Sequence, residues 1–224
     1  MPVIAIDGPS GSGKGTVSRR VAAVLGYHLL DSGALYRLVG LAGLRAGLDA
    51  ADEAGHAQLA ARMDVRFGTS AAGAEQVLLG AEDVSQAIRT ELAGNLASKV
   101  AGFPAVRAAL VGRQRGFAAP PGLVADGRDM GTVIFPDARL KVFLTASPEE
   151  RAARRHKQLK DKGLNVSLAG LSREIAERDR RDSTRAVSPL VAAADAIHLD
   201  STQLTPEEVV ARVLTLARER LAGA

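Results

Sequence analysis

A glycine-rich segment near the amino terminus contains residue types that bind phosphate. It fits the pattern G-x-x-x-x-G-K-[ST] through Gly8, Gly13 and Lys14, except that Gly15 stands at the last position and Thr16 follows. Glycines let successive backbone N–H groups point at phosphate oxygens, and a lysine reaches the β- and γ-phosphates. The segment therefore predicts a nucleoside triphosphate site. Its expected contacts are Gly8, Pro9, Ser10, Gly11, Ser12, Gly13, Lys14, Gly15 and Thr16.

The segments on either side of this loop are those that such a site requires. Residues 3–6 are an apolar, β-branched run, and residues 17–25 carry apolar positions at helical spacing. A flexible linker is the alternative, but the order strand, loop, helix favours the phosphate site. A dinucleotide fingerprint fails because Thr16 stands where its third glycine belongs, and that interpretation leaves Lys14 unexplained.

A basic-residue excess is confined to one part of the chain. Residues 151–185 hold 11 Lys and Arg against 5 Asp and Glu, while the whole chain has a net charge of +4. Nucleic acid is one possible partner for such a surface. However, aromatic residues are only 3% of the chain and Trp is absent, so bases have little to stack on. Arginines that neutralise nucleotide phosphates explain the excess equally well, and the phosphate loop favours them.

Composition excludes several other classes of protein. With 224 residues, 46% hydrophobic and 24% charged, the chain is expected to fold around one good-sized core. It has no Cys and only 4 scattered His, which excludes disulfides and thiolate metal sites. No apolar run approaches the roughly 20 residues of a membrane span, and the start resembles no signal peptide. We expect a cytoplasmic protein that binds no membrane.

The remaining sequence alternates apolar strands with amphipathic helices. Strands are expected at residues 3–7, 27–30, 123–126, 141–144 and 196–199, and helices at 17–25, 34–48, 53–63, 85–100, 104–117, from 148 onward and at 205–221. This order predicts an α/β fold of the P-loop NTPase type, a parallel sheet of about five strands with helices on both faces. Short alternating runs near residues 64–67, 76–79 and 83–84 predict a small antiparallel sheet inserted into it.

The residues after the strand at 123–126 indicate what receives the phosphoryl group. A hydrolase or switch is expected to show an aspartate, often followed by glutamate, at such a strand end. Here Gly127 and Arg128 follow Asp126. Glycine allows close backbone approach, and the forked guanidinium of Arg128 suits a phosphate. The pattern therefore favours an acceptor that is itself anionic.

A second candidate anion site follows the strand at residues 27–30. Ser32 and helix N-terminal N–H groups could hold an anion there, with Arg37 one turn later. A helix capped by Ser32, with a solvated Arg37, explains the same residues. This segment alone leaves both interpretations open.

Four motifs together resemble those of the bacterial cytidylate kinase family. They lie at residues 8–16, 31–37, 126–132 and 178–185, in the family's order and spacing over essentially the whole chain. The insertion near residues 63–98 is similar to the one that distinguishes this family among nucleoside monophosphate kinases. The resemblance implies a single kinase domain over residues 1–224. Its expected parts are a core at about 1–31, 101–150 and 186–224, a small α+β part that binds the nucleoside monophosphate at about 32–100, and a short lid at about 151–185.

The resemblance also assigns an acceptor, CMP or dCMP, to particular residues. It implies that the phosphate is held by Ser32, Arg37, Arg128 and Arg185, the ribose by Arg178 and Asp182, and the cytosine by Ser98, Arg107 and Asp129. Guanidinium groups suit phosphate, and carboxylates suit hydroxyl or amino groups. The residue chemistry alone predicts an anionic acceptor, and only the resemblance points to cytosine. Taken singly, Ser98 and Arg107 are interpreted as helix-surface residues.

The donor is expected to be ATP bound with Mg²⁺. Thr16 is expected to bind the ion directly or through water, and Asp126 is expected to bind it through water. Arg151 and Arg155 lie four apart on one helix face. Similar arginine pairs of related kinases place Arg151 near adenine and Arg155 near the phosphates, with Arg154 as an alternative.

We therefore predict in-line transfer of the γ-phosphoryl group of ATP to CMP or dCMP by a monomeric enzyme that binds no nucleic acid. The transferring charge is expected to be stabilised by Lys14, Arg128, Arg155, Arg178 and Arg185. One alternative is a kinase for UMP, AMP or a non-nucleotide alcohol, although an alcohol leaves the acceptor arginines unexplained. Another is an ATP-binding switch that acts near nucleic acid, which steep salt dependence would reveal.

Overall fold

The computed structural model describes residues 1–69, 75–161 and 163–221. Within it the chain divides into two compact units, of which unit 1 comprises residues 1–31 and 114–224 and unit 2 comprises residues 32–113. Residues 70–74 of the expected insertion and residue 162 of the expected lid lie outside the described part.

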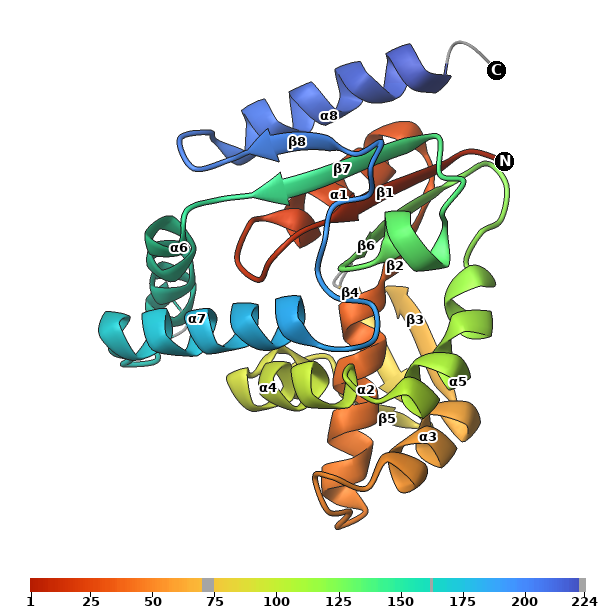
Figure 1. Cartoon of the computed structure of the whole chain (residues 1–224), viewed down its shortest axis with the longest axis vertical. Helices are drawn as coiled ribbons and strands as arrows, with labels where there is room; N and C mark the ends of the chain where they lie inside the picture. The colour runs from red at the N-terminus through yellow and green to blue at the C-terminus, as the bar shows by residue number, and fades with distance from the viewer. Residues whose placement is uncertain (70–74, 162, 222–224) are drawn as a thin grey trace. The chain divides into compact units, whose positions relative to one another are not determined.

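Unit 1 is built on a five-stranded parallel sheet in the order β2-β6-β1-β7-β8 (Figure 1). The strands are β1 (Val3–Asp7), β2 (His28–Asp31), β6 (Leu123–Gly127), β7 (Leu140–Thr145) and β8 (Ile197–Asp200). All five residues of β1 are buried, and β1 pairs in parallel with both β6 and β7. The predicted parallel sheet is confirmed, and its carboxyl-terminal edge collects the segments that follow all five strands.

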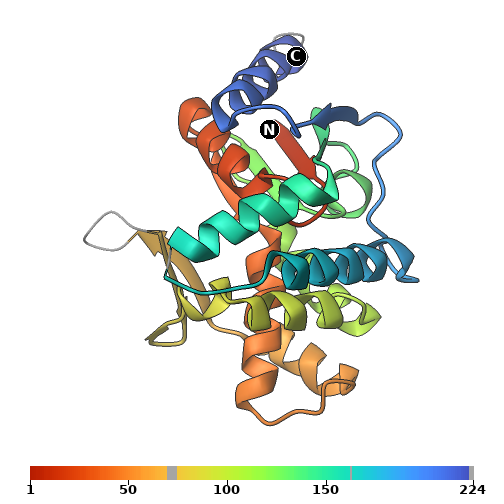
Figure 2. The same ribbon diagram turned by 90° about the vertical axis from the view of Figure 1, so that its left-hand side faces the viewer.

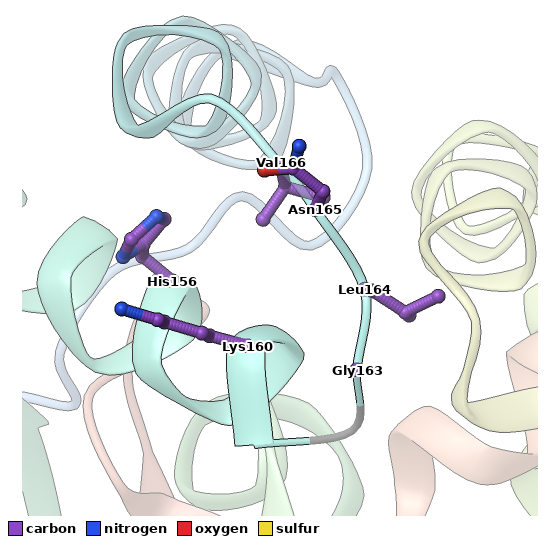
Figure 3. A pocket seen from close by; sticks show the side chains of 6 residues that line it. All are labelled: His156, Lys160, Gly163, Leu164, Asn165 and Val166. Atoms are coloured by element: carbon purple, nitrogen blue, oxygen red, sulfur yellow. The ribbon is translucent and has the colours of Figure 1, made fainter.

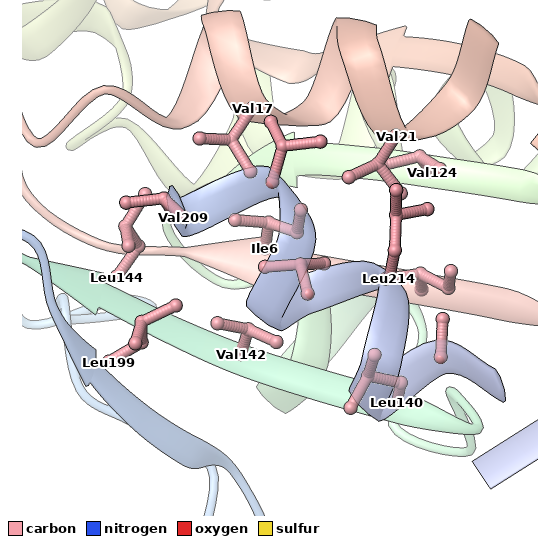
Figure 4. Packing of buried hydrophobic residues seen from close by; sticks show 14 of the residues in the cluster. Ile6, Val17, Val21, Val124, Leu140, Val142, Leu144, Leu199, Val209 and Leu214 are labelled. Atoms are coloured by element: carbon pink, nitrogen blue, oxygen red, sulfur yellow. The ribbon is translucent and has the colours of Figure 1, made fainter. Parts of the chain in front are cut away.

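Helices α1 (Lys14–Leu25) and α8 (Pro206–Leu221) cover one face of this sheet. Figure 4 shows Ile6 and Val142 of the sheet packed between side chains such as Val17 of α1 and Leu214 of α8. Each fully buried aliphatic side chain of this kind stabilises the fold by roughly 1.5–3 kcal/mol. Since side chains alternate along a strand, Asp7 points to the opposite face, where one helical turn, η2 (Met130–Ile134), lies against β1.

Two further helices of unit 1, α6 (Pro148–Asp161) and α7 (Leu168–Thr184), pack against each other (Figure 1, Figure 2). Ser147 accepts a hydrogen bond from the Glu150 backbone N–H at 3.2 Å, so α6 begins at the predicted cap. The loop from α7 back to β8 returns the chain to the sheet.

Unit 2 contains α2 (Ser32–Arg45), α3 (Glu53–Arg62) and α4 (Glu91–Val100). Helices α2 and α4 pack closely, since a Cβ on Gly40 would lie 2.7 Å from the Leu96 Cβ. Strands β3 (Val65–Thr69), β4 (Glu75–Leu79) and β5 (Glu82–Asp83) form the small antiparallel sheet, which confirms that prediction.

One expected helix, at residues 85–100, is wrong as a continuous element. The structure has a short turn, η1 (Ala87–Arg89), followed by α4. Thr90 lies between them in an extended conformation, and its Oγ1 accepts the Ala93 N–H at 3.2 Å. A side-chain cap of this kind satisfies an N–H at the start of a helix, so Thr90 starts a new helix instead of continuing the old one.

Helix α5 (Pro104–Arg115) is hydrogen-bonded to α3 and to Met63, the residue that follows α3. The Ala105 N–H donates to Glu53 Oε1 at 2.7 Å, and Arg113 Nη2 donates to the Met63 carbonyl at 2.7 Å. These long-range hydrogen bonds explain why unit 2 extends to residue 113, beyond the boundary expected near residue 100.

Candidate functional site

The phosphate-binding loop joins β1 to α1 in a backbone conformation that its glycines permit. A Cβ on Gly8 would lie 2.0 Å from the Leu144 carbonyl oxygen, so only glycine fits where the loop passes β7. Gly13 has φ +93° and is the N-cap residue of α1. The expected order of strand, loop and helix is therefore present in unit 1.

Lys14, the first residue of α1, folds back over the loop. Its Nζ donates to the Pro9 carbonyl at 2.8 Å and lies 3.5 Å from Ser12 Oγ. Burial is the main cause that lowers the pKa of Lys14 to about 7, and the nearby Arg128 guanidinium lowers it further. A buried lysine with cationic neighbours favours an anionic ligand. A bound phosphate would stabilise the charged form of Lys14 and raise its pKa again.

Arg128 and Arg178 are brought together by one carboxylate. Arg128 Nε donates to Asp182 Oδ2 at 3.2 Å, and Arg178 Nε lies 3.9 Å from the same oxygen. Arg178 Nη1 also donates to Ser10 Oγ of the phosphate-binding loop at 3.3 Å. Both guanidinium groups act on the pKa of Lys14. The structure therefore gathers Lys14, Arg128 and Arg178 into one cationic cluster beside the loop.

Asp126, the acid at the end of β6, lies next to the unusual glycine of the motif. A Cβ on Gly15 would lie 3.4 Å from Asp126 Oδ2. Burial raises the pKa of Asp126 to about 6, while the Lys14 ammonium opposes that rise. Thr16 is exposed at the first turn of α1. One hydroxyl and one carboxylate fit a Mg²⁺ ion that keeps most of its ligands as water and phosphate oxygens.

No self-sufficient metal cage accompanies these groups. Among the residues that the structure describes, no cluster of three or more His, Cys, Asp or Glu could hold a metal ion. In the same part of the chain, none of the helices is long and apolar enough to cross a bilayer.

The arginines of the expected lid differ in what they contact. Arg151 is buried and donates to Asp179, to the Ser10 carbonyl at 3.0 Å and to the Ala146 carbonyl at 3.1 Å. Arg155 is partly exposed, and its Nη1 donates to Gln158 Oε1 at 3.2 Å.

Arg154, the alternative lid arginine, lies near the phosphate-binding loop. Its Nη1 is 3.8 Å from the position of a Cβ on Gly13. Nη1 and Nη2 donate to the Oγ and the carbonyl of Ser201 at 3.1 and 2.6 Å. The Ser201 hydroxyl lies 2.8 Å from the Thr145 carbonyl and 3.1 Å from the Ser12 carbonyl, and it can donate to either. Ser201 therefore lies between α6 and the phosphate-binding loop.

Two further predicted acceptor residues of unit 1, Asp129 and Arg185, lie close in sequence to Arg128 and Arg178 respectively. Asp129 is buried and precedes η2, which begins at Met130. Arg185 ends α7, and its Nε donates to the Ser188 carbonyl. Asp182 lies within α7 and is buried, so the structure orders its carboxylate toward Arg128.

The predicted acceptor residues of unit 2 are largely buried. Ser98 and Arg107 are 8% and 5% exposed, so their interpretation as helix-surface residues is wrong. The Arg107 guanidinium lies over the Tyr36 ring, 5.5 Å from its centroid, and its Nη1 donates to the Ala101 carbonyl at 3.0 Å. The arginine is thus held in a fixed orientation.

The anion site expected at Ser32 and Arg37 also has buried polar atoms. Helix α2 begins at Ser32, which is buried. Arg37 Nε is buried and has no hydrogen-bond partner within residues 1–69, 75–161 and 163–221. A buried guanidinium N–H without a partner is costly, which favours the anion site over a solvated arginine.

Sequence reasoning did not single out Asp7, Tyr36, Asp179 and Ser201 as functional residues. Asp7 and Ser201 lie at or just after the carboxyl ends of parallel strands, which is a signal that could have found them. Tyr36 and Asp179 act through long-range contacts, with Arg107 and Arg151 respectively, and no local pattern marks such pairs.

A cavity of about 340 Å³ lies at the far end of the α6 and α7 pair (Figure 3). In Figure 3, His156 and Lys160 extend from α6, and Asn165 and Val166 lie across the cavity from them. None of its lining residues belongs to the predicted ATP or CMP sites.

Comparisons with known proteins agree over the full length. A family model described as cytidylate kinase matches residues 4–219. A cytidylate kinase of Pseudomonas syringae pv. tomato is 59% identical over 224 residues, covering 99% of this chain and 98% of that protein. One from Methylococcus capsulatus is 56% identical over 97% of each chain. One from Klebsiella pneumoniae is 56% identical over 100% of this chain and 98% of that protein.

Proposed function

Because the chain belongs to the cytidylate kinase family, we propose that it transfers the γ-phosphoryl group of ATP to CMP and dCMP, giving ADP with CDP or dCDP. The structural observation that supports this best is the cluster of Lys14, Arg128 and Arg178 beside the phosphate-binding loop. A cluster of three cationic side chains suits the ATP triphosphate and the CMP phosphate, two anionic groups that must approach each other.

The reaction needs alignment and positive charge more than acid–base chemistry. The attacking atom is an oxygen of the acceptor phosphate, which is already anionic at neutral pH, so a dedicated general base is unnecessary. Backbone N–H groups of the loop bind the phosphates of ATP, and Lys14 contacts the β- and γ-phosphates. Arg128 and Arg178 share the charge that spreads over the transferring group.

On this proposal CMP is bound through its phosphate, its ribose and its base. Its phosphate binds Ser32, Arg37, Arg128 and Arg185, its ribose binds Arg178 and Asp182, and its base binds Ser98, Arg107 and Asp129. The buried Nε of Arg37 supports the phosphate assignment, because an acceptor oxygen would satisfy it. The Ala101 carbonyl and the Tyr36 ring hold Arg107 in one orientation, which supports its assignment to the base.

On the donor side, Mg²⁺ would be held by Thr16 and, through water, by Asp126. When bound, the ion would neutralise phosphate charge beside Lys14. Arg151 and Arg155 are proposed to bind ATP, and the position of Arg154 near Gly13 makes it a second candidate for the phosphates. We further propose a monomeric, cytoplasmic enzyme that binds no nucleic acid, which light scattering and polynucleotide-binding assays would test.

The deciding experiment is a coupled ADP-release assay with ATP, Mg²⁺ and a panel of acceptors. The panel contains CMP, dCMP, UMP, AMP, GMP and a sample without acceptor. Strong turnover with CMP and dCMP alone is expected. Preference for another monophosphate would keep the phosphate contacts and reject the base contacts. ATP hydrolysis that ignores the panel but responds to a polynucleotide would favour the switch.

A further inference from the structure

One carboxylate in unit 1 joins two segments more than 100 residues apart. Asp7 Oδ1 accepts the backbone N–H of Met130 at 2.9 Å, and Oδ2 accepts that of Gly131 at 2.8 Å, at sequence separations of 123 and 124. Asp7 is the last residue of β1 and directly precedes Gly8 of the phosphate-binding loop. Met130 directly follows Asp129. The carboxylate therefore connects the start of the phosphate-binding loop to the segment that carries Arg128 and Asp129.

The carboxylate of Asp7 is buried, and burial disfavours its charged form. Asp7 is 5% exposed, and burial raises its pKa to about 6, while the N–H groups of Gly131 and Met130 oppose that rise. Paired N–H donors on one carboxylate are charge-assisted and fix both the distance and the direction of the backbone they hold. A neutral side chain would avoid the cost of burial but could not accept from both N–H groups in this way.

The segment that Asp7 holds also lies close to the side chain of Lys141. A Cβ on Gly131 would lie 3.1 and 3.2 Å from Cδ and Cγ of Lys141, and 3.4 Å from Asp7 Oδ2. Lys141 is itself held by a 2.9 Å ion pair between its Nζ and Asp195. A Cβ on Gly131 would therefore require the Lys141 side chain or the backbone to shift by a few tenths of an ångström.

We propose that Asp7 is a positioning residue for the acceptor, which sets the backbone after Asp129 and thereby the directions of the Asp129 carboxylate and the Arg128 guanidinium. The inference rests on the proposed function, in which Asp129 reads cytosine and Arg128 binds the acceptor phosphate. Asp7 contacts neither substrate in this account. It acts through Met130 and Gly131, and it fixes their position relative to β1, the strand that precedes the phosphate-binding loop.

The test is Asp7→Asn in the full-length protein. Asparagine has nearly the same shape, but its amide group presents N–H to one of the two backbone N–H donors. Leaving one buried N–H unsatisfied is expected to raise the KM for CMP about 10- to 100-fold and to reduce the preference for CMP over UMP. The Kd of a non-hydrolysable ATP analogue, measured by calorimetry without acceptor, is expected to stay within about twofold of the wild-type value.

Asp83→Asn is the matched control. Asp83 lies in unit 2, and its carboxylate also accepts a backbone N–H, that of Ser85 at 2.9 Å. This variant is expected to leave the KM for CMP and the base preference unchanged. If Asp7→Asn has the same kinetic constants as the control, Asp7 positions nothing. An equal loss of ATP-analogue affinity and CMP affinity would also overturn the proposal, because Asp7 would then support the whole site.

A second variant keeps the proposal testable if Asp7→Asn folds poorly. Gly131→Ala retains Asp7 and adds a Cβ 3.1 Å from Lys141 Cδ, which pushes this backbone and the Lys141 side chain apart. It is expected to raise the KM for CMP without changing ATP-analogue affinity, and an unchanged KM would contradict the inference. A wild-type enzyme that prefers another monophosphate would reject the proposed function, and the same ratio of KM values, measured with that acceptor, would still decide the role of Asp7.

Discussion

The guanidinium group of Arg151 on α6 forms a bidentate ion pair with Asp179 on α7. Its Nη1 donates to Oδ1 at 3.0 Å, and its Nη2 donates to Oδ2 at 2.6 Å. The same group donates to the Ser10 and Ala146 carbonyls. One buried arginine therefore connects α6 and α7 to the phosphate-binding loop and to the end of β7. The proposed contact of Arg151 with ATP would have to be made by a side chain that already has four protein hydrogen bonds.

Arg151→Ala is expected to lower the free energy of unfolding by about 2–4 kcal/mol, because it leaves two carbonyls and a partly buried carboxylate without their donor. Urea denaturation without nucleotide measures this change. Arg20→Ala is the control, since the pair of Arg20 with Glu207 is largely exposed, with side chains 47% and 69% accessible. That variant is expected to lose less than about 1 kcal/mol. Equal losses would show that the Arg151 pair is no stronger than a surface ion pair.

Lys14→Ala is expected to reduce kcat about 10²- to 10³-fold with folding retained, because the variant loses a cation aimed at the transferring phosphate. Turnover with CMP and a thermal unfolding curve are the two measurements. Lys99→Ala replaces an exposed lysine of α4 and is expected to behave as wild type. A Lys14→Ala enzyme that turns over near the wild-type rate would remove Lys14 from the mechanism.

ATP binding is expected to take up protons at alkaline pH. The pKa of Lys14 is lowered to about 7 in the nucleotide-free protein, mainly by burial, so the amine is largely neutral at pH 8. Phosphate favours the ammonium form, and binding should therefore be accompanied by proton uptake at Lys14 at pH 8. The contribution of Lys14 to affinity should fall as pH rises above 7.

Calorimetry of an ATP analogue in two buffers of different ionisation enthalpy measures this uptake directly. Lys14→Met removes the titrating group and is the control, in which the alkaline uptake should disappear. Proton release, or equal uptake by the variant, would contradict the assignment to Lys14.

Asp129→Ala is expected to reduce discrimination between CMP and UMP by at least about tenfold, because a charge-assisted hydrogen bond to the cytosine amino group would be lost. The ratio of kcat/KM values for the two acceptors is the measurement. Asp137→Ala changes an exposed aspartate eight residues later and should leave the ratio unchanged. If Asp129→Ala keeps the wild-type ratio, the cytosine assignment is wrong.

Tyr36→Leu is expected to raise the KM for CMP about 2- to 30-fold, because the Arg107 guanidinium loses the ring that it lies over. Tyr36→Phe keeps the ring and should retain most of the affinity. The comparison separates the aromatic face from the hydroxyl group. Equal KM values for the two variants would mean that the ring does not orient Arg107.

Much of the architecture is readable from local patterns. The order of strand, glycine loop and helix, the five parallel strands and the small antiparallel sheet each follow from apolar periodicity and turn residues within about 15 positions. The boundary at Thr90 was missed because the apolar spacing continues across it. A hydrogen bond from one hydroxyl, not a change in hydrophobicity, ends the first turn and begins α4.

The amino-acid sequence by itself determined the phosphate-binding loop, the α/β fold and the family, because these depend on residue types at short spacing and on motifs in a fixed order. Only the tertiary structure decided which side chains are held, and by what. It joined Asp7 to Gly131, paired Arg151 with Asp179, and buried Arg107 against Tyr36. The physical reason is that burial and hydrogen bonding order a side chain, and here some of the partners are 124 and 141 positions away.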